Sequence, residues 1–143
     1  MVPSQTAFEQ GAHLSFEDVA VDSWETPRLL RVKLKASKTD PFRAGVDVFI
    51  GATGNSLCPV AAVLAYMSMR GPGPGPLFRF QHGSPLTRAR LVSEVRSALT
   101  VAGVDCRACS GHSFRSGAAT TADNEGVEDS TIKMLGRWKS EAT

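Results

Sequence analysis

The first third of the chain alternates apolar and polar residues, which is the pattern of half-buried β-strands. The pattern occurs three times, at residues 13–21, 28–35 and 46–50. In the second stretch Leu30, Val32 and Leu34 point to one face and basic residues point to the other. Residues 40–45 contain Pro and Gly and supply a turn. The pattern predicts a small antiparallel sheet of three strands with one basic face.

Further along the chain, apolar residues recur every three or four positions, which predicts helices. The first helix begins near Pro59, which suits a first turn, and stops at the Gly-Pro run of residues 71–76. The second follows Thr87, whose hydroxyl can cap it, and ends at Gly103. It carries an apolar stripe, which consists of Leu91, Val92, Val95, Leu99 and Ala102.

Two more helices are expected toward the C-terminus. One runs from about His112 to near Gly126, and a shorter one is capped by Asp129 and stops at Gly136. No internal repeat is visible, and 143 residues fit one domain with one core. The expected fold class is α+β and mostly α, a helical core with the three-stranded antiparallel sheet at one side.

The composition excludes several classes of protein. Hydrophobic residues make up 42% of the chain, which is ordinary for a globular protein. No apolar run approaches the ~20 residues of a membrane span, and the first residues lack the basic and apolar regions of a secretory signal. Three cysteines argue against a disulfide framework and suit a reducing compartment. We therefore expect an intracellular protein with no membrane partner.

The net charge of +2 conceals an uneven distribution. Residues 31–115 hold twelve basic and four acidic side chains, whereas residues 1–30 hold one basic and five acidic side chains. The middle of the chain therefore has a local excess of eight positive charges, which attracts polyanions such as nucleic acids. Scattered basic residues are also typical of an ordinary solvated surface.

The candidate chemistry is concentrated in residues 110–119, Ser-Gly-His-Ser-Phe-Arg-Ser-Gly-Ala-Ala. His112 and Arg115 are three positions apart, so both lie on one face in the first turn of the expected helix. A helix N-terminus presents unpaired N–H groups and a partial positive charge. An imidazole and a guanidinium at this end favour binding of an oxyanion, most naturally a phosphate. The spacing alone would equally suit a solvated helix start.

A zinc site is a second interpretation of the same region. Cys106, Cys109 and His112 have the spacing that is typical of zinc ligands. A structural site needs a fourth ligand, which would have to come from Cys58, His13 or His82. His112 belongs to both interpretations, so they largely exclude each other. We expect the phosphate site, with no bound metal.

Three motifs, taken together, resemble the catalytic domain of tyrosine recombinases, the phage-integrase-like enzymes that break and rejoin DNA. In chain order they are Ser37-Lys38-Thr39, residues 110–119, and Leu135-Gly136-Arg137-Trp138. The resemblance covers nearly the whole chain and is strongest to recombinase-like genes of eukaryotic mobile elements, the crypton-like branch. It implies DNA recombination and integration, DNA as the partner, oligomers assembled on DNA, no cofactor, and a nuclear location in a eukaryote.

The resemblance also implies a role for each residue. Arg115 corresponds to the second arginine of the family's active site, His112 to its acid/base, and Lys38 to its general acid. Trp138 corresponds to the residue that donates a hydrogen bond to a non-bridging phosphate oxygen. Lys35 is the alternative to Lys38. Additional phosphate contacts are assigned to Lys35, Arg43 and Ser113.

In this family a tyrosine attacks the DNA phosphodiester and forms a 3′-phosphotyrosyl intermediate. No tyrosine follows Trp138, no arginine precedes residue 13, and the only tyrosine, Tyr66, is expected to pack in the core or to have a capped hydroxyl. Residues 1–143 are therefore interpreted as one partial catalytic domain, inactive in cleavage. The DNA-clamping domain, the helix with the first arginine and the helix with the nucleophilic tyrosine are expected to be absent from them.

Two alternatives remain open at this point. One is a non-catalytic nucleic-acid-binding or regulatory module that uses the basic face of the sheet. The other is a small interaction domain stapled by zinc.

Overall fold

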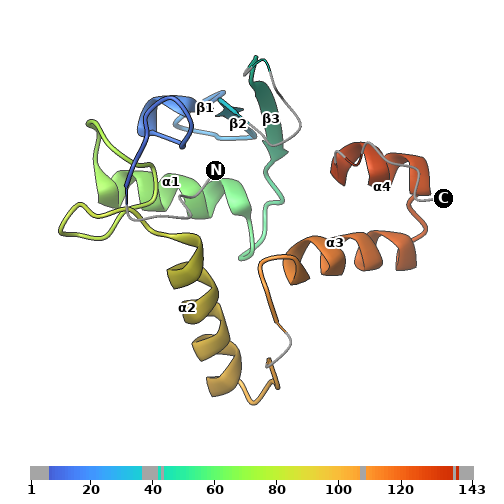
Figure 1. Ribbon diagram of the computed structural model, residues 1–143. Helices are drawn as coiled ribbons and strands as arrows, with labels where there is room; N and C mark the ends of the chain where they lie inside the picture. The colour runs from blue at the N-terminus through green and yellow to red at the C-terminus, as the bar shows by residue number, and fades with distance from the viewer. Residues whose placement is uncertain (1–6, 37–41, 43, 107–108, 137, 139–143) are drawn as a thin grey trace. The chain divides into compact units, whose positions relative to one another are not determined.

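The computed structural model describes residues 7–36, 42, 44–106, 109–136 and 138 (Figure 1). These residues form helices and a three-stranded antiparallel sheet, which confirms the predicted α+β class. The chain divides into two compact units, residues 1–89 and residues 90–143. A single domain over residues 1–143 stays a prediction.

The first unit contains the sheet, in which β2 lies between β1 and β3. The strands are β1 (Val19–Val21), β2 (Leu29–Leu34) and β3 (Val46–Gly51). Leu30 lies opposite Ile50 and Arg31 lies opposite Phe49 in the register of β2 and β3. Because side chains alternate along a strand, the two pairs lie on opposite faces of the sheet. The predicted apolar face is present. The other face carries Arg31 and Lys33 from β2 but Phe49 and Asp47 from β3, so it is mixed and not simply basic.

The strand predicted at residues 13–21 is wrong in its first half. A 3-10 turn, η1 (Phe16–Asp18), stands there in place of extended backbone. The backbone N–H of Ser15 donates to Asp18 Oδ2 at 2.8 Å, and the Ser15 hydroxyl donates to the same oxygen at 2.7 Å. A serine and an aspartate three residues apart can satisfy each other locally, and this bonding competes successfully with the extended conformation.

Helix α1 (Pro59–Arg70) packs against the apolar face of the sheet (Figure 1). Leu30 from β2 and Val60 from α1 are both 0% exposed and form the centre of the core. Burial of one such side chain contributes about 1.5–3 kcal/mol. Pro59 occupies the first turn, and Gly71 ends the helix with a φ of 72°, as predicted.

Arg70, the last residue of α1, organises the Gly-Pro loop that follows. Its Nε donates to the carbonyls of Pro76 and Leu77 at 3.2 and 3.0 Å, and its Nη1 donates to the Gly71 carbonyl at 2.8 Å. The guanidinium also lies over the ring of Phe16, 5.3 Å from its centroid. The loop is therefore folded around a cation that the protein itself supplies.

The second unit contains α3 (Ser113–Asn124), α4 (Asp129–Gly136) and nearly all of α2 (Arg88–Val101). Helices α3 and α4 pack against each other, and their bounds agree closely with the predicted ones. None of the helices in the described ranges is long and apolar enough to cross a membrane.

The apolar stripe predicted for α2 does not form a buried face. None of the residues of α2 is buried, and Ala102 lies beyond the end of the helix. The polar side of α2 makes the specific contacts instead. Arg96 Nε donates to the Cys109 carbonyl at 2.9 Å, which ties α2 to the loop before α3.

A buried polar cluster surrounds Lys35, the residue after β2. Its ammonium lies 2.7 Å from Asp18 Oδ2, 3.1 Å from Ser15 Oγ and 2.8 Å from the Gln10 carbonyl oxygen. Asp18 is only 8% exposed. Burial raises the pKa of Asp18, but the hydrogen bonds from Lys35 and Ser15 together lower it by more than burial raises it. The pKa of Asp18 therefore lies below its ordinary value. The cluster fastens residues 10–18 to the end of β2.

Replacing the carboxylate in Asp18→Asn should destabilise the protein by roughly 3 kcal/mol at pH 7, because Lys35 stays partly buried without its partner. The pKa of Asp18 is depressed by folding, so its contribution is complete above the unfolded-state pKa of about 3.9 and is lost as the pH falls through the folded-state value. Urea denaturation of both proteins should therefore give a large difference at pH 7 that decreases as the pH falls below about 3.9.

Asp47→Asn is the matched control for Asp18→Asn. The Asp47 carboxylate lies 3.8 Å from Arg31, and the two side chains are 38% and 53% exposed. An exposed pair of this kind contributes about 0–1 kcal/mol. A difference for Asp18→Asn that is the same at pH 7 and pH 3 would contradict the assigned ion pair.

Candidate functional site

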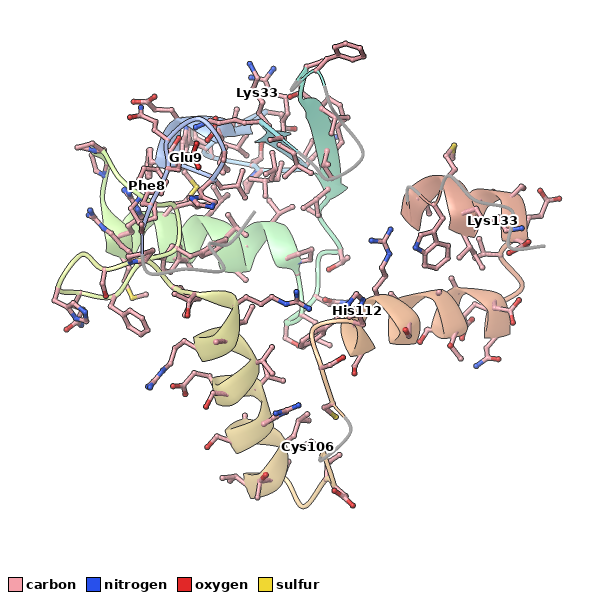
Figure 2. All side chains as sticks on the ribbon, in the orientation of Figure 1. Phe8, Glu9, Lys33, Cys106, His112 and Lys133 are labelled. Carbon is pink, nitrogen blue, oxygen red and sulfur yellow. The ribbon has the colours of Figure 1, made fainter. Side chains whose placement is uncertain are left out.

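Two of the predicted site residues lie at the N-terminus of α3. His112 is the N-cap residue and Arg115 lies in the first turn; Figure 2 shows His112 at this end of the helix. Both residues are exposed. The Ser110 N–H donates to Ser113 Oγ at 2.9 Å, and the His112 N–H donates to Ser110 Oγ at 3.2 Å. These bonds fix the turn from which the imidazole and the guanidinium extend.

Trp138 lies against Arg115, although the two residues belong to separate sequence motifs. The guanidinium carbon of Arg115 is 5.2 Å from the centroid of the Trp138 ring. Such a cation–π contact contributes about 0.5–1 kcal/mol at an exposed site. The Trp138 backbone N–H donates to the Lys133 carbonyl at 3.0 Å, which joins it to the last turn of α4. The packing of α3 on α4 thus brings together two of the residues assigned to catalysis.

The electrostatics of this arrangement favour an anion. In the part of the chain that the structure describes, Arg115 forms no ion pair with a carboxylate. Its N–H donors lie in the plane of the guanidinium, in a fork that matches two oxygens of a phosphate or carboxylate. The partial positive charge of the helix N-terminus adds to the attraction. The site can therefore bind an oxyanion through Arg115, with His112 three residues earlier at the N-cap of the same turn.

Of the other assigned residues, Ser113 lies in the same turn as His112 and Arg115, and the rest lie elsewhere in the chain. Lys35 belongs to the first unit, where Asp18 and Ser15 occupy its ammonium. The Ser113 hydroxyl oxygen accepts the Ser110 N–H and still has a proton to donate. Lys38 and Arg43 lie outside the described residues.

Tyr66 has a structural role in the first unit. Its hydroxyl donates to the Leu77 carbonyl at 3.1 Å and accepts the Arg79 N–H at 2.9 Å. Its ring centroid lies 5.3 Å from that of Phe78. These contacts confirm the prediction of a packed tyrosine with a capped hydroxyl.

The cysteines before α3 are engaged by the protein. The Cys106 thiol donates to the Arg96 carbonyl at 3.4 Å, and the Cys109 carbonyl accepts from the Arg96 guanidinium. Across the described ranges, no group of three or more His, Cys, Asp or Glu side chains is close enough to hold a metal ion. Cys106, Cys109 and His112 therefore do not meet as zinc ligands. An open depression of about 750 Å³ lies beside them, lined by Arg96, Thr100, Gly103, Val104, Asp105 and Cys106.

In the sequence, Cys58 is noticed only as a possible fourth zinc ligand. The structure places it at the N-cap of α1. The backbone N–H groups near its sulfur, those of Ala61 and Thr53, lower the pKa of Cys58 to about 7. The Thr53 nitrogen is 3.4 Å from the sulfur, and Cys58 is 7% exposed. Cys58 therefore occupies the N-cap position of α1 with its thiol inside the core of the first unit. The signal in the sequence is its position directly before Pro59.

Comparison with known proteins finds similarity to the integrase/recombinase xerD homolog of Selenomonas ruminantium. The two sequences are 28% identical in an alignment of 141 residues that covers 90% of this chain and 39% of that protein. The chain thus spans about two fifths of the length of the relative that it matches. No family model matches the sequence, and no solved structure matches it. The similarity connects the chain with integrases and recombinases.

Tyr66→Phe tests the structural role of the tyrosine. The substitution leaves the Arg79 N–H without its acceptor, and an unsatisfied group of this kind costs about 1–3 kcal/mol. The free energy of unfolding, measured by urea denaturation, should fall by that amount. Phe78→Tyr is a suitable comparison because it keeps a ring at the neighbouring position. Unchanged stability of Tyr66→Phe would show that the hydroxyl is not capped in solution.

Proposed function

We propose that this chain is the phosphate-binding part of a tyrosine recombinase catalytic domain, whose reaction is DNA recombination and integration. The contact between Arg115 and Trp138 is the observation that supports this most strongly, because it joins two of the three motifs on which the resemblance rests. The similarity to the Selenomonas integrase/recombinase supports the same family. DNA is the proposed partner, bound through its phosphates.

In the proposed complex, one DNA phosphate lies at the N-terminus of α3. The Arg115 fork donates to its non-bridging oxygens, and the Trp138 indole N–H donates to one of them. His112 acts as acid/base at the reacting oxygens. Negative charge accumulates on the phosphate oxygens in the pentavalent transition state, so these donors bind it more strongly than they bind the substrate.

Residues of the first unit, together with Ser113 of the second, have supporting roles in the proposal. Lys38 is the proposed general acid that protonates the leaving 5′ oxygen, and Arg43 contacts a neighbouring phosphate. Both lie between β2 and β3 in the sequence. Ser113 and Lys35 are further proposed phosphate contacts. For Lys35, this role requires exchange of the Asp18 carboxylate for a phosphate oxygen.

The proposed reaction uses a tyrosine nucleophile, and Tyr66 does not fit that role. Its hydroxyl is held by the backbone of Leu77 and Arg79 in the first unit. We therefore propose that residues 1–143 bind DNA without cleaving it by themselves. The resemblance alone supports four further parts of the proposal: assembly as oligomers on DNA, origin in a mobile element, the crypton-like branch and a nuclear location. The relative from Selenomonas ruminantium is bacterial and does not support the last two.

Combined substitution His112→Ala/Arg115→Ala tests the phosphate site. Charge-assisted hydrogen bonds contribute about 1.5–3 kcal/mol each, so the affinity for duplex DNA should fall more than tenfold. Fluorescence anisotropy with a fluorescein-labelled duplex at low salt measures it. Arg88→Ala is the control, because it removes an exposed positive charge from α2. Unchanged affinity of the double variant would favour a binding module that uses another basic surface.

The salt dependence of the same binding gives a second test. Neutralising phosphates releases counterions, so log Kobs should fall linearly with log salt, with a slope of about −0.9 for each phosphate neutralised. A flat response would contradict binding through phosphates.

A suicide DNA substrate tests whether residues 1–143 cleave DNA. Denaturing gel electrophoresis should show no covalent protein–DNA adduct, because Tyr66 is the only tyrosine and is held in the first unit. An adduct through Tyr66 would contradict its structural role. Tyr66→Phe, run in parallel, identifies the attachment site of any adduct.

A further inference from the structure

The turn after α4 contains a close contact between Gly136 and the ring of Trp138. A Cβ built on Gly136 would lie 3.1 Å from Cδ2 of the indole and 3.2 Å from Cε2 and Cε3. Cδ2 and Cε2 form the bond shared by the two rings, and Cε3 belongs to the six-membered ring. The backbone of Gly136 therefore lies against the ring, at a distance closer than most Cβ contacts, so a side chain at position 136 would require the ring to shift.

We infer that Gly136 is a positioning residue for the candidate site. Because Gly136 has no side chain, the Trp138 ring can lie against the end of α4, and in this position the ring contacts the Arg115 guanidinium. The same ring contacts Gly136 and Arg115. The backbone N–H of Trp138 donates to the Lys133 carbonyl at 3.0 Å, and this hydrogen bond fixes the backbone of the turn. The consequence for DNA rests on the proposed function, whereas the contact itself does not.

An alanine at position 136 should displace the ring without unfolding the helix. Gly136 has no positive φ, so alanine fits the backbone conformation. Alanine also has a higher helix propensity than glycine. The three atoms nearest to this Cβ all belong to the indole, which is 40% exposed and therefore has solvent on one side into which it can shift. The expected result is a weaker contact between Trp138 and Arg115.

Trp138 fluorescence measures this displacement directly. The chain has two tryptophans, and Trp24→Phe removes the other one, which is 67% exposed in the first unit. In this background Gly136→Ala should shift the Trp138 emission to longer wavelength and raise its acrylamide quenching constant. Gly117→Ala is the matched control, because nothing lies within 4 Å of a Cβ there and its φ is not positive. It should leave both quantities unchanged.

Anisotropy with labelled duplex DNA measures the effect on the site. Because a displaced ring restrains Arg115 less and presents its indole N–H less well to a phosphate, the affinity of Gly136→Ala should be about two- to fivefold lower. If emission changes but neither Gly136→Ala nor His112→Ala/Arg115→Ala alters DNA binding, the proposed function fails and the positioning of Trp138 stands. If the double variant loses binding and Gly136→Ala keeps it, the positioning role for the phosphate site is overturned.

Unchanged emission and quenching in Gly136→Ala would overturn the inference, as would an equal change in Gly117→Ala. A double-mutant cycle keeps the test decisive if Gly136→Ala lowers stability. In a Trp138→Ala background the ring is gone, so Gly136→Ala should no longer destabilise the protein. Destabilisation of the same size with and without the ring would place the effect in the backbone and refute the inference.

Discussion

The contact between the Arg115 guanidinium and the Trp138 ring holds the candidate site together. Arg115 is on α3 and Trp138 follows α4, so the pair exists only when these two helices pack together. The ring occupies one side of the cation while the N–H donors remain for an oxyanion. A guanidinium on a long flexible side chain loses entropy when it binds a phosphate, and a ring that already restrains it reduces that loss.

The basic residues of the chain divide into those that hold the fold and those that remain for a ligand. Lys35 is occupied by Asp18 and Ser15, Arg70 by the carbonyls of the Gly-Pro loop, and Arg96 by the Cys109 carbonyl. Their positive charges are satisfied within the protein and attract an external polyanion less than the net count suggests. The excess of eight charges in residues 31–115 therefore overstates the field available to DNA. His112 and Arg115 at the N-terminus of α3 belong to the available group.

The arrangement separates phosphate binding from covalent chemistry. Donors for an oxyanion are present in the second unit, whereas the only tyrosine is bonded to the backbone of the first unit. A covalent nucleophile performs a step that hydrogen-bond donors do not replace, so a site with donors alone binds phosphate and leaves it intact. The proposed function of residues 1–143 is accordingly phosphate binding without cleavage.

Local patterns in the sequence determined the strands β2 and β3, the helix bounds and the position of His112 and Arg115 in one turn, because periodicity and caps act over a few residues. They failed at residues 15–18, where Ser15 and Asp18 bond to each other. In α2 the predicted helix is present, but its apolar stripe is only half-buried, with Val92, Val95 and Leu99 intermediate in exposure. The resemblance assigned Arg115 and Trp138 to one site, but only the packing of α3 on α4 brought them into contact. Tertiary structure likewise decided the partners of Lys35, Arg70 and Tyr66. Local spacing does not show which residue, many positions away, will form a hydrogen bond with a given side chain.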